Sequence, residues 1–403
     1  MKILIVSQFY APDITACAFR ISETAKLLSE KGWEVHVIAA LPHKTLINKD
    51  FNDGIVKVNR LPIIPYKGGG KASYLLHYLS FMAVAFIKGI LNREKYDAIW
   101  VTSPPLFTAV AGYALAVIKH CPICLDIRDL WPDSAVSAGQ ISENSLAYKA
   151  ARIVEKFLYR RSTCITCVSK PMANHIKKIT NKPVCIIYNG TEKKYINLEK
   201  VPFKDYDKVC LRYTGNIGRC QNISLLTDAA FLLQERNVKG FRIEIIGDGA
   251  EKALIQNKIQ ENNLANIFIK PPVTKDEAMQ LMIESDALLL HIKNDETMAK
   301  TVPSKLFDYM AAGTPILYGL KGEGAEILSK SGGNLAYDPD SPEDLADKIE
   351  FFLKNRQKLT KKARKNAKIA LKRYTREAMT EKLMKFLSKY SRQGLVDGGQ
   401  KRQ

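Results

Sequence analysis

The stretch "TVPSKLFDYMAAGTPIL", Thr301 to Leu317, predicts a short helix that leads directly into a buried strand. Pro303 suits the first turn of a helix, and Ser304 is a residue type that can cap free backbone N–H groups. Gly313 and Pro315 end the helix, and the apolar residues after them are typical of a strand. The stretch is therefore one helix-to-strand step of an α/β fold.

The predicted helix has two different faces. Lys305 and Asp308 are three residues apart and share one face, whereas Leu306 and Met310 share the face that we expect to be buried. The start of the helix thus presents N–H groups, a cation and a carboxylate together. A ligand with negative charge at one end and hydroxyl groups at the other would fit, although a surface ion pair between the two side chains is the simpler interpretation.

Strand-like segments alternate with helical patterns along the rest of the chain. The predicted strands are 2–7, 34–40, 56–60, 97–103, 123–129, 164–169 and 184–190, followed by 209–215, 242–249, 267–273, 287–292, 315–320 and 334–338. Repeated βα units form parallel sheets that are covered on both faces. A polar connector at 191–207 interrupts the series, so we predict two Rossmann-like domains that face one another. Their expected bounds are 1–190 and 191–375, with a helix at 376–390 that returns to the first domain and a disordered tail at 391–403.

Length and apolar content agree with this division. The chain has 403 residues, of which 46% are hydrophobic, which is more than one ordinary core needs. The N-terminus begins a strand at once and lacks the pattern of a signal peptide. The longest apolar run, 75–90, contains His77 and Lys88 and is short for a membrane span of about 20 residues. We therefore expect a cytoplasmic protein that does not cross the membrane.

The net charge of +20 favours anionic partners such as nucleic acid, anionic lipid or phosphorylated small molecules. Lys354 to Arg376 contains eleven basic residues and no acidic one. This run fits a solvated helix face equally well. No recognised nucleic-acid motif and no platform of aromatic and basic residues accompanies the charge, so we predict no nucleic-acid partner.

The eight cysteines include two CxxC pairs, Cys121/Cys124 and Cys164/Cys167. Four thiolates with this spacing resemble a zinc site. Both pairs lie in or beside predicted strands, where residues three apart point to opposite faces, so one ion could not collect both sulfurs of a pair. Buried structural cysteines in a reducing compartment are the better interpretation.

Glycines follow several of the predicted strands, at the edge where parallel sheets bind ligands. In "YTGNIGRCQN", Gly215 and Gly218 would let backbone N–H groups approach a phosphate, and Arg219 would add charge. Gly247 and Gly249 in "IIGDGAEKALI" stand at a similar strand-to-helix turn. A tight turn without a ligand remains an alternative for both loops. The first βα loop contains no glycine, so a dinucleotide fingerprint is absent.

A third loop, "YGLKGEGAEIL", places glycines and acids before a helix. Its N–H groups could meet an anion or sugar hydroxyls, and Glu323 or Glu326 could accept hydrogen bonds from hydroxyls. For Glu326, simple solvation of the helix is the alternative.

Taken together, these segments resemble the GT-B glycosyltransferases of retaining family 4. The resemblance also includes "SPPLFTAVAGYALA" and "LDIRDLWPDS", which look like the bacterial subgroup that makes O-antigen, capsule or colanic acid. It implies two Rossmann-like domains around a central cleft. Within the subgroup the resemblance favours transfer of N-acetyl-L-fucosamine from its UDP derivative into O-antigen.

The resemblance also assigns roles to residues. Asp308, where glutamate is usual, would hold the ribose hydroxyls; Lys305 and the amides near Ser304 would face the diphosphate; the loop around Val273 would cover the base. The expected donor-binding residues are Gly215, Asn216, Gly218, Arg219, Gly247, Gly249, Val273, Ser304, Lys305, Leu306, Asp308, Glu323 and Glu326. The expected catalytic residues are Arg128, Asp129 and Lys305.

Two positions differ from the family pattern. Lys300 stands where a glutamate is frequent, and Arg128 precedes Asp129 where a histidine is frequent. A buried structural pair is the alternative for Arg128 and Asp129. The implied reaction retains configuration by attack on the face of the leaving diphosphate, with cationic side chains in place of a metal and with no cofactor.

The implied acceptor is a sugar on undecaprenyl diphosphate, which requires access to the cytoplasmic face of the inner membrane. Two apolar stretches, 74–91 and 105–118, with Arg20, Lys67, Lys71 and Lys88 in the same domain, suit peripheral binding to anionic lipid. Buried core helices are the alternative for both stretches. A UDP-sugar 2-epimerase of the same fold is a further alternative, but only six scattered histidines are present.

Overall fold

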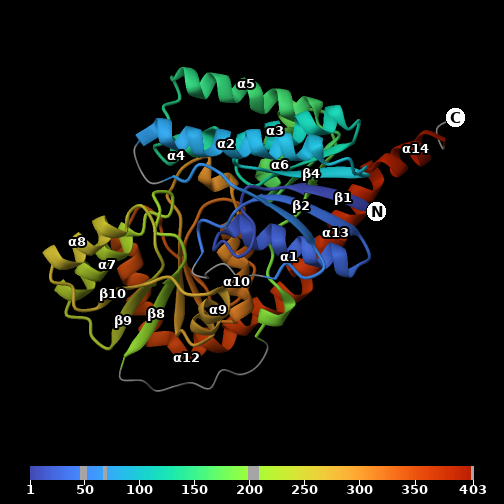
Figure 1. Cartoon of the computed structure of the whole chain (residues 1–403). Coiled ribbons are helices and arrows are strands. Elements are labelled where there is room, and N and C mark those ends of the chain that lie inside the picture. Colours follow the sequence, from blue (N-terminus) through green and yellow to red (C-terminus); the bar gives the residue numbers. More distant parts are fainter. Residues whose placement is uncertain (46–51, 67–69, 198–207, 401–403) are drawn as a thin grey trace. The chain divides into compact units, whose positions relative to one another are not determined.

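The computed structural model describes residues 1–45, 52–66, 70–197 and 208–400, which form two compact α/β units (Figure 1). Unit 1 comprises Met1–Val136, Ile141–Asn189 and Arg376–Gln403, and unit 2 comprises Ser137–Gln140 and Gly190–Thr375. All thirteen strands predicted from the sequence are present, and every strand pair is parallel. The predicted α/β class with two parallel sheets is therefore confirmed.

Unit 1 contains a seven-stranded sheet in the order β3-β2-β1-β4-β5-β6-β7. Its strands are β1 (Lys2–Val6), β2 (Glu34–Ala40), β3 (Lys57–Leu61), β4 (Ala98–Ser103), β5 (Ile123–Ile127), β6 (Cys164–Cys167) and β7 (Val184–Ile186). The helices are α1 (Ala16–Glu30), α2 (Gly70–Leu91), α3 (Leu106–Ile118), α4 (Asp133–Ser137), α5 (Leu146–Arg161), α6 (Lys170–Ile179), α13 (Arg376–Tyr390) and α14 (Arg392–Gln400). Apolar side chains on both faces of β1 and β4 are buried, as expected for a sheet that helices cover on both sides.

Unit 2 contains a six-stranded sheet in the order β10-β9-β8-β11-β12-β13. Its strands are β8 (Val209–Thr214), β9 (Phe241–Ile246), β10 (Ile267–Lys270), β11 (Ala287–His291), β12 (Ile316–Gly319) and β13 (Leu335–Ala336). Its α-helices are α7 (Ser224–Glu235), α8 (Lys252–Glu261), α9 (Lys275–Ile283), α10 (Ser304–Ala312), α11 (Glu323–Ser329) and α12 (Pro342–Arg373), with 3-10 turns η1 (Lys193–Tyr195) and η2 (Met298–Lys300).

The strand order reverses direction at one point in each sheet. In unit 1 this point lies between β1 and β4, and in unit 2 it lies between β8 and β11. Loops at the carboxyl ends of such neighbouring strands run away from each other and leave room for a ligand. The loop after β8, which begins at Gly215, lies at this position in unit 2.

The basic run Lys354 to Arg376 lies almost wholly within α12. This helix buries an apolar stripe that includes Phe352, Leu359 and Ala363, while most of its lysines point to solvent. Arg356 is an exception, because it is buried and forms an ion pair of 2.5 Å with Asp286. The run is thus the charged face of an amphipathic helix, as the simpler interpretation holds.

The chain returns to unit 1 after unit 2. Helix α13 packs beside α1 (Figure 1), and Met379, Leu383 and Leu387 join the core that contains Ile3 and Ile5 of β1.

The prediction of a disordered tail from residue 391 is wrong for the described part, which forms α14. The Ser391 hydroxyl accepts a hydrogen bond from the Gly394 N–H (3.2 Å), and Arg392 donates to the carbonyls of Lys119 (3.2 Å) and His120 (3.0 Å). These contacts hold the start of the helix in spite of its glycine-rich composition.

The apolar helices of unit 1 differ in exposure. Helix α3 buries Leu106, Ala109 and Leu115 in the core, whereas Val117 and Ile118 at its end are exposed. Its role at a lipid surface stays a prediction. Helix α2 packs through Phe81, Ala85 and Gly89, and a Cβ at Gly89 would lie 2.4 Å from Leu115 of α3. Its opposite side is open, with exposed side chains at Leu75, Leu76, Ile87, Ile90 and Leu91. Within the described residues, only its segment Ala72–Leu91 is long and apolar enough for a membrane span, and 22% of the window tested is buried.

Arg20 is not available to lipid, contrary to the prediction. It is 2% exposed, and its guanidinium forms two hydrogen bonds to the Asp126 carboxylate, at 3.0 Å and 2.8 Å. It also donates to the carbonyls of Ile187 and Tyr188, both at 3.1 Å. Arg20 is therefore structural. Lys88 is exposed, whereas Lys67 and the side chain of Lys71 lie outside the described residues.

The CxxC cysteines occupy opposite faces of the unit 1 sheet, as the spacing predicts. Cys124 and Cys164 are register partners on β5 and β6 and belong to one core, whereas Cys121 and Cys167 belong to the other. All four are buried free thiols. In the described part of the chain, no group of three or more His, Cys, Asp or Glu residues could hold a metal ion.

Candidate active site

Two glycine loops join at the carboxyl edge of the unit 2 sheet. The Gly215 N–H donates to the Ile246 carbonyl (2.9 Å), and the Ile217 N–H donates to the Asp248 carbonyl (2.8 Å). A Cβ at Gly247 would lie 1.9 Å from the Gly215 carbonyl oxygen. The backbones after β8 and β9 thus pack directly on each other, which requires glycine at this position.

Gly249 completes the contact between these loops, and Gly218 lies close to side chains of its own loop. A Cβ at Gly249 would lie 2.4 Å from the Ile217 carbonyl oxygen, and one at Gly218 would lie 2.4 Å from the Asn216 side-chain amide. Gly215 and Asn216 are exposed, so the first turn of the loop is open to solvent. The two loops approach each other closely at these glycines, and the N–H groups of Gly215 and Ile217 are used in that contact. Binding of a phosphate by the loop stays a prediction.

Helix α10 brings Lys305 to this loop. Lys305 Nζ donates to the Tyr213 hydroxyl (2.6 Å) and lies 3.9 Å from the centroid of the Tyr213 ring. A Cβ at Gly215 would be 3.0 Å from the same nitrogen. The lysine of the opening stretch and the first glycine of "YTGNIG" therefore meet at one place.

The Lys305 ammonium lacks an anionic partner in the described parts of the chain, since no carboxylate lies within ion-pair distance of Nζ. Burial lowers the pKa of Lys305 to about 7, and no neighbouring charge offsets that effect. The interpretation of Lys305 and Asp308 as an i,i+3 ion pair is therefore wrong. A partly buried ammonium group without a counter-charge is a favourable site for an anionic ligand.

The N-terminus of α10 remains open. The N-cap is Pro303 and no side chain caps the helix, so Ser304 is the first helical residue and the expected capping by its hydroxyl does not occur. Leu306 is buried and anchors the helix. Asp308 follows Lys305 by one turn and is half-buried.

The start of α11 lies beside the start of α10. A Cβ at Gly324 would be 3.6 Å from both Leu306 Cδ1 and Pro303 Cδ, and one at Gly322 would be 2.1 Å from the Ala299 carbonyl oxygen. Glu323 is buried at the first position of α11, whereas Glu326 is exposed. The structure thus places Glu323 close to the α10 terminus and leaves Glu326 in solvent, which favours the simpler interpretation for Glu326.

Two other predicted donor residues lie less close to Lys305. The Arg219 guanidinium donates to the Ala138 carbonyl (3.4 Å), and no contact with Lys305 occurs among the described residues. Val273 is half-buried in the loop between β10 and α9. Thr274 and Glu277 form a capping box that fixes the end of this loop.

In unit 1, Arg128 and Asp129 follow β5. The Arg128 N–H donates to the Ser103 carbonyl (2.8 Å), and its guanidinium donates to the Pro104 carbonyl. Arg128 and Asp129 do not form an ion pair, so the interpretation as a buried structural pair is wrong. Burial raises the pKa of the Asp129 carboxyl to about 6, and Arg128 opposes that rise. In the described residues no donor contacts this carboxylate, which leaves it available to a ligand.

Two side chains near the carboxyl edge of the unit 2 sheet were not predicted to be of interest. Tyr213 ends "LRY" in β8, and its alternation as an inward strand residue predicts only a core position. His291 ends β11, is fully buried, and shares a 3.1 Å hydrogen bond between Nδ1 and the Tyr337 hydroxyl. Burial lowers the pKa of His291 to about 4, so the imidazole is neutral. A histidine at the carboxyl end of a strand beside the reversal point was the available signal.

Both units match models of known families. Residues 15–190 match the glycosyl transferase 4-like domain, and residues 196–370 match the glycosyl transferases group 1 domain. The chain is a GT-B-type glycosyltransferase. This glycosyltransferase is related to enzymes of surface polysaccharide synthesis. WcaI of Escherichia coli (strain K12), a glycosyl transferase assigned to colanic acid biosynthesis, is 25% identical over 78% of this chain and 82% of its own length.

Other relatives and solved structures agree. The uncharacterised glycosyltransferase MJ1178 of Methanocaldococcus jannaschii is 24% identical over 94% of this chain and 95% of its own length. Anabaena HepE in complex with UDP and glucose superposes with a TM-score of 0.72 at 17% identity, over 96% of this chain and 99% of that chain. WaaG, a glycosyltransferase involved in lipopolysaccharide biosynthesis, superposes with a TM-score of 0.71 at 13% identity, over 96% of this chain and 100% of that chain. At these identities the solved structures bear on the fold alone, and they confirm the predicted GT-B class.

Proposed function

We propose that this glycosyltransferase transfers a UDP-activated amino sugar, such as N-acetyl-L-fucosamine, to a saccharide on undecaprenyl diphosphate in surface polysaccharide synthesis. One observation carries the donor part: Lys305 is a partly buried lysine without a counter-charge, held at a glycine loop and an open helix N-terminus. These groups complement a diphosphate in charge and in hydrogen-bond donors. The choice of UDP agrees with the UDP and glucose bound in the HepE structure, which has the same fold, and the choice of pathway agrees with the assignment of WcaI to colanic acid biosynthesis.

In this proposal the groups around Lys305 stabilise the leaving diphosphate. Negative charge on the diphosphate grows as the bond to the sugar breaks, and a nearby ammonium and N–H groups lower the barrier to that step. Attack from the same face would retain the configuration of the sugar. Because Lys305 supplies positive charge, we propose that no metal is required, and turnover should persist after dialysis against EDTA.

Asp308 would accept hydrogen bonds from the ribose hydroxyls. Losing such bonds to a charged acceptor costs roughly 1.5–3 kcal/mol, which corresponds to about ten- to a hundredfold in affinity. Asp308→Ala should therefore weaken donor binding, whereas Lys305→Ala should lower turnover more than affinity. Asp347→Ala, on an exposed position of α12, is the matched control.

The experiment is a thermal-stability screen of the whole chain with UDP, GDP and their sugars. A nucleotide at 100 times its Kd should add about 2.7 kcal/mol to the free energy of unfolding. Calorimetry and single-turnover rates on the binding nucleotide then compare Asp308→Ala, Lys305→Ala and the control. No stabilisation by any nucleotide sugar, or wild-type affinity and turnover in both site variants, would remove the basis of the proposal.

For unit 1 we propose that Arg128 and Asp129 act at the reaction centre. A carboxyl group with a pKa of about 6 and no partner can accept a proton from an acceptor hydroxyl near neutral pH. Asp129→Asn should lower turnover by at least tenfold and leave donor affinity within about twofold. An equal loss in both quantities would indicate a structural role instead.

We also propose that unit 1 binds the cytoplasmic face of the inner membrane through α2 and α5. The outer face of α5 carries Leu146, Ile153 and Phe157, which are 84%, 69% and 45% exposed. Lys149, Lys156, Arg160 and Arg161 lie along the same exposed side. An apolar stripe flanked by basic side chains is typical of helices that lie in the surface of an anionic bilayer.

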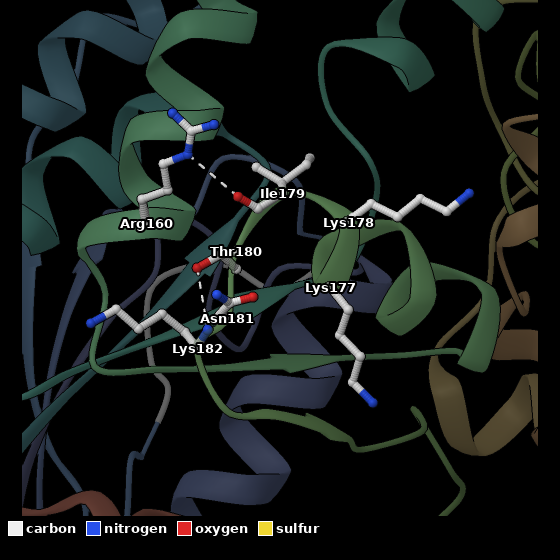
Figure 2. Close-up of a pocket in the computed structure, with 7 residues that line it drawn as sticks. All are labelled: Arg160, Lys177, Lys178, Ile179, Thr180, Asn181 and Lys182. Atoms are coloured by element: carbon white, nitrogen blue, oxygen red, sulfur yellow. Dashed lines mark hydrogen bonds between the residues drawn. The ribbon is translucent and has the colours of Figure 1, made fainter.

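A basic hollow of about 540 Å³ continues this surface beyond the end of α5. It is lined by Arg160, Lys177, Lys178, Ile179, Thr180, Asn181 and Lys182 (Figure 2). Figure 2 shows that the three lysines point away from one another, so they cannot close around a single phosphate. Separate headgroups of a lipid surface suit this divergent arrangement better.

Co-sedimentation with vesicles tests this surface. Binding should require anionic lipid and decrease at high salt, because salt screens surface charge. Ile153→Glu with Phe157→Glu should abolish binding, whereas Leu254→Glu, at an exposed apolar position on α8 of unit 2, should not. Equal binding of all variants, or no binding of the wild type to anionic vesicles at low salt, would contradict the membrane proposal and leave the donor site untouched.

A further inference from the structure

Tyr213 is fully buried, and its hydroxyl connects two parts of the candidate donor site. It accepts a hydrogen bond from Lys305 Nζ (2.6 Å) and donates its own proton to the Asn216 carbonyl (2.6 Å). A phenol has one proton to give, and the Asn216 carbonyl takes it. The direction of donation in these two hydrogen bonds is therefore fixed: the ammonium donates to the phenol, and the phenol donates to the glycine loop.

We propose that Tyr213 is a positioning residue for the transfer reaction, because it holds the rotation of the Lys305 ammonium and the conformation of the Gly215–Gly218 loop in one arrangement. The inference rests on the proposed donor site. An ammonium group has three N–H donors on a freely rotating bond. With one donor bound to Tyr213, the other two have fixed directions and can meet two oxygens of a diphosphate.

The surroundings make this restraint specific to Tyr213. Among the described residues, the hydroxyl of Tyr213 is the only hydrogen-bond acceptor that contacts Lys305 Nζ, and its ring lies against the same nitrogen at 3.9 Å. Without the hydroxyl, the ammonium would keep its contact with the ring but lose the one hydrogen bond that fixes the directions of its N–H groups. The Asn216 carbonyl would also lose its donor, which would free the loop on the other side.

The role differs from simple support of the fold. A positioning group acts most strongly where charge grows, so its loss should reduce the maximal rate more than it reduces donor affinity. A residue that only stabilises the loop would, when changed, weaken binding and stability together. The ratio of these effects separates the two roles.

Tyr309 offers a matched control. Its hydroxyl is also fully buried and accepts a hydrogen bond from the Thr214 N–H (2.9 Å), one residue from Tyr213. Among the described residues its hydroxyl contacts Thr214 and not Lys305. Tyr309→Phe therefore measures what loss of a buried hydroxyl at this strand end does to rate, affinity and stability.

The experiment compares Tyr213→Phe and Tyr309→Phe in the whole chain, with the nucleotide sugar that the stability screen identifies. We expect Tyr213→Phe to lower kcat about tenfold and to change the Kd of UDP, measured by calorimetry, by less than threefold. Tyr309→Phe should change kcat and Kd by similar factors. Tyr213→Phe should slow the Lys305→Ala protein by much less than tenfold, because Tyr213 acts mainly through Lys305.

Two results would overturn the inference. One is a kcat of Tyr213→Phe within twofold of the wild type, and the other is an additive loss of rate in the double variant. Either result could occur while UDP still binds at Lys305, so failure of the positioning role is distinguishable from failure of the donor site. If no nucleotide binds the wild type, the proposed function itself fails.

Discussion

Replacement of Lys305 by methionine should make the protein more stable and inactive at the same time. In the unfolded chain the lysine has a pKa near 10.5, and in the folded protein burial lowers it to about 7. The folded state therefore binds fewer protons than the unfolded state between these two values. Below pH 7 the charged Lys305 lowers the free energy of unfolding by its full amount. This loss of stability becomes smaller as pH rises toward 10.5.

The magnitude follows from the gap between the two pKa values. At about 1.4 kcal/mol for each pH unit, the gap corresponds to an upper limit of about 4–5 kcal/mol at pH 6. Lys305 is partly exposed, and its hydrogen bond to Tyr213 and its contact with the ring oppose the loss, so we expect a gain of about 1–3 kcal/mol. For a domain of this size, that gain raises the midpoint of thermal unfolding by roughly 3–8 °C.

The assay is thermal unfolding of the wild type and Lys305→Met at pH 6 and pH 9.5, beside turnover of the donor. The stability difference should be large at pH 6 and mostly absent at pH 9.5. Lys330→Met, at an exposed lysine directly after α11, should show no such dependence on pH. A Lys305→Met protein that is less stable than the wild type at pH 6 would refute the view that Lys305 is a partly buried cation without a counter-charge.

Three further substitutions test other parts of the structure. Gly247→Ala places a Cβ 1.9 Å from the Gly215 carbonyl oxygen, so it should destabilise the protein by about 1–3 kcal/mol and weaken UDP binding; unaltered calorimetric affinity would contradict the role of the loop contact. Burial lowers the pKa of His291 to about 4, so the wild type should lose about 3 kcal/mol of unfolding free energy as pH falls from 6.5 to 4. His291→Phe should remove this part of the loss. Urea midpoints that fall equally with pH in both proteins would disprove this. Arg20→Met should cost about 3–5 kcal/mol by stranding the Asp126 carboxylate, and Arg20→Met with Asp126→Leu should recover most of that loss in chemical denaturation; no recovery would argue against the pair.

Local signals were sufficient for the fold. Runs of apolar residues bounded by Gly, Pro and Asn predicted every strand, because fully buried parallel strands are continuous apolar segments. The same signals placed Gly215, Gly247 and Lys305 at one edge of a sheet. The structure of residues 391–400 could not be predicted from local composition, because α14 is held by contacts of Arg392 with a loop that is distant in sequence.

Side-chain partners depended on contacts that sequence spacing does not contain. Lys305 and Asp308 share a helix face, but Lys305 reaches across to Tyr213, which is 92 residues earlier. The sequence predicted a surface position for Arg20, but in the fold it is paired with Asp126, which is 106 residues later in the chain. The exposed apolar face of α5 was missed because the five basic residues of this helix mask the apolar stripe in its average composition.

The return of α13 to unit 1 has a consequence for synthesis on the ribosome. The core around β1 needs Met379, Leu383 and Leu387, which are made only after all of unit 2. The main segment of unit 2, Gly190–Thr375, begins and ends at adjacent backbone positions, since the Thr191 N–H donates to the Tyr374 carbonyl at 2.9 Å. It can therefore fold as a closed insertion while the apolar face of α1 still awaits its cover. During that interval nascent unit 1 should be the part that chaperones hold, and a stop codon after Thr375 should yield a folded unit 2 joined to an aggregation-prone unit 1.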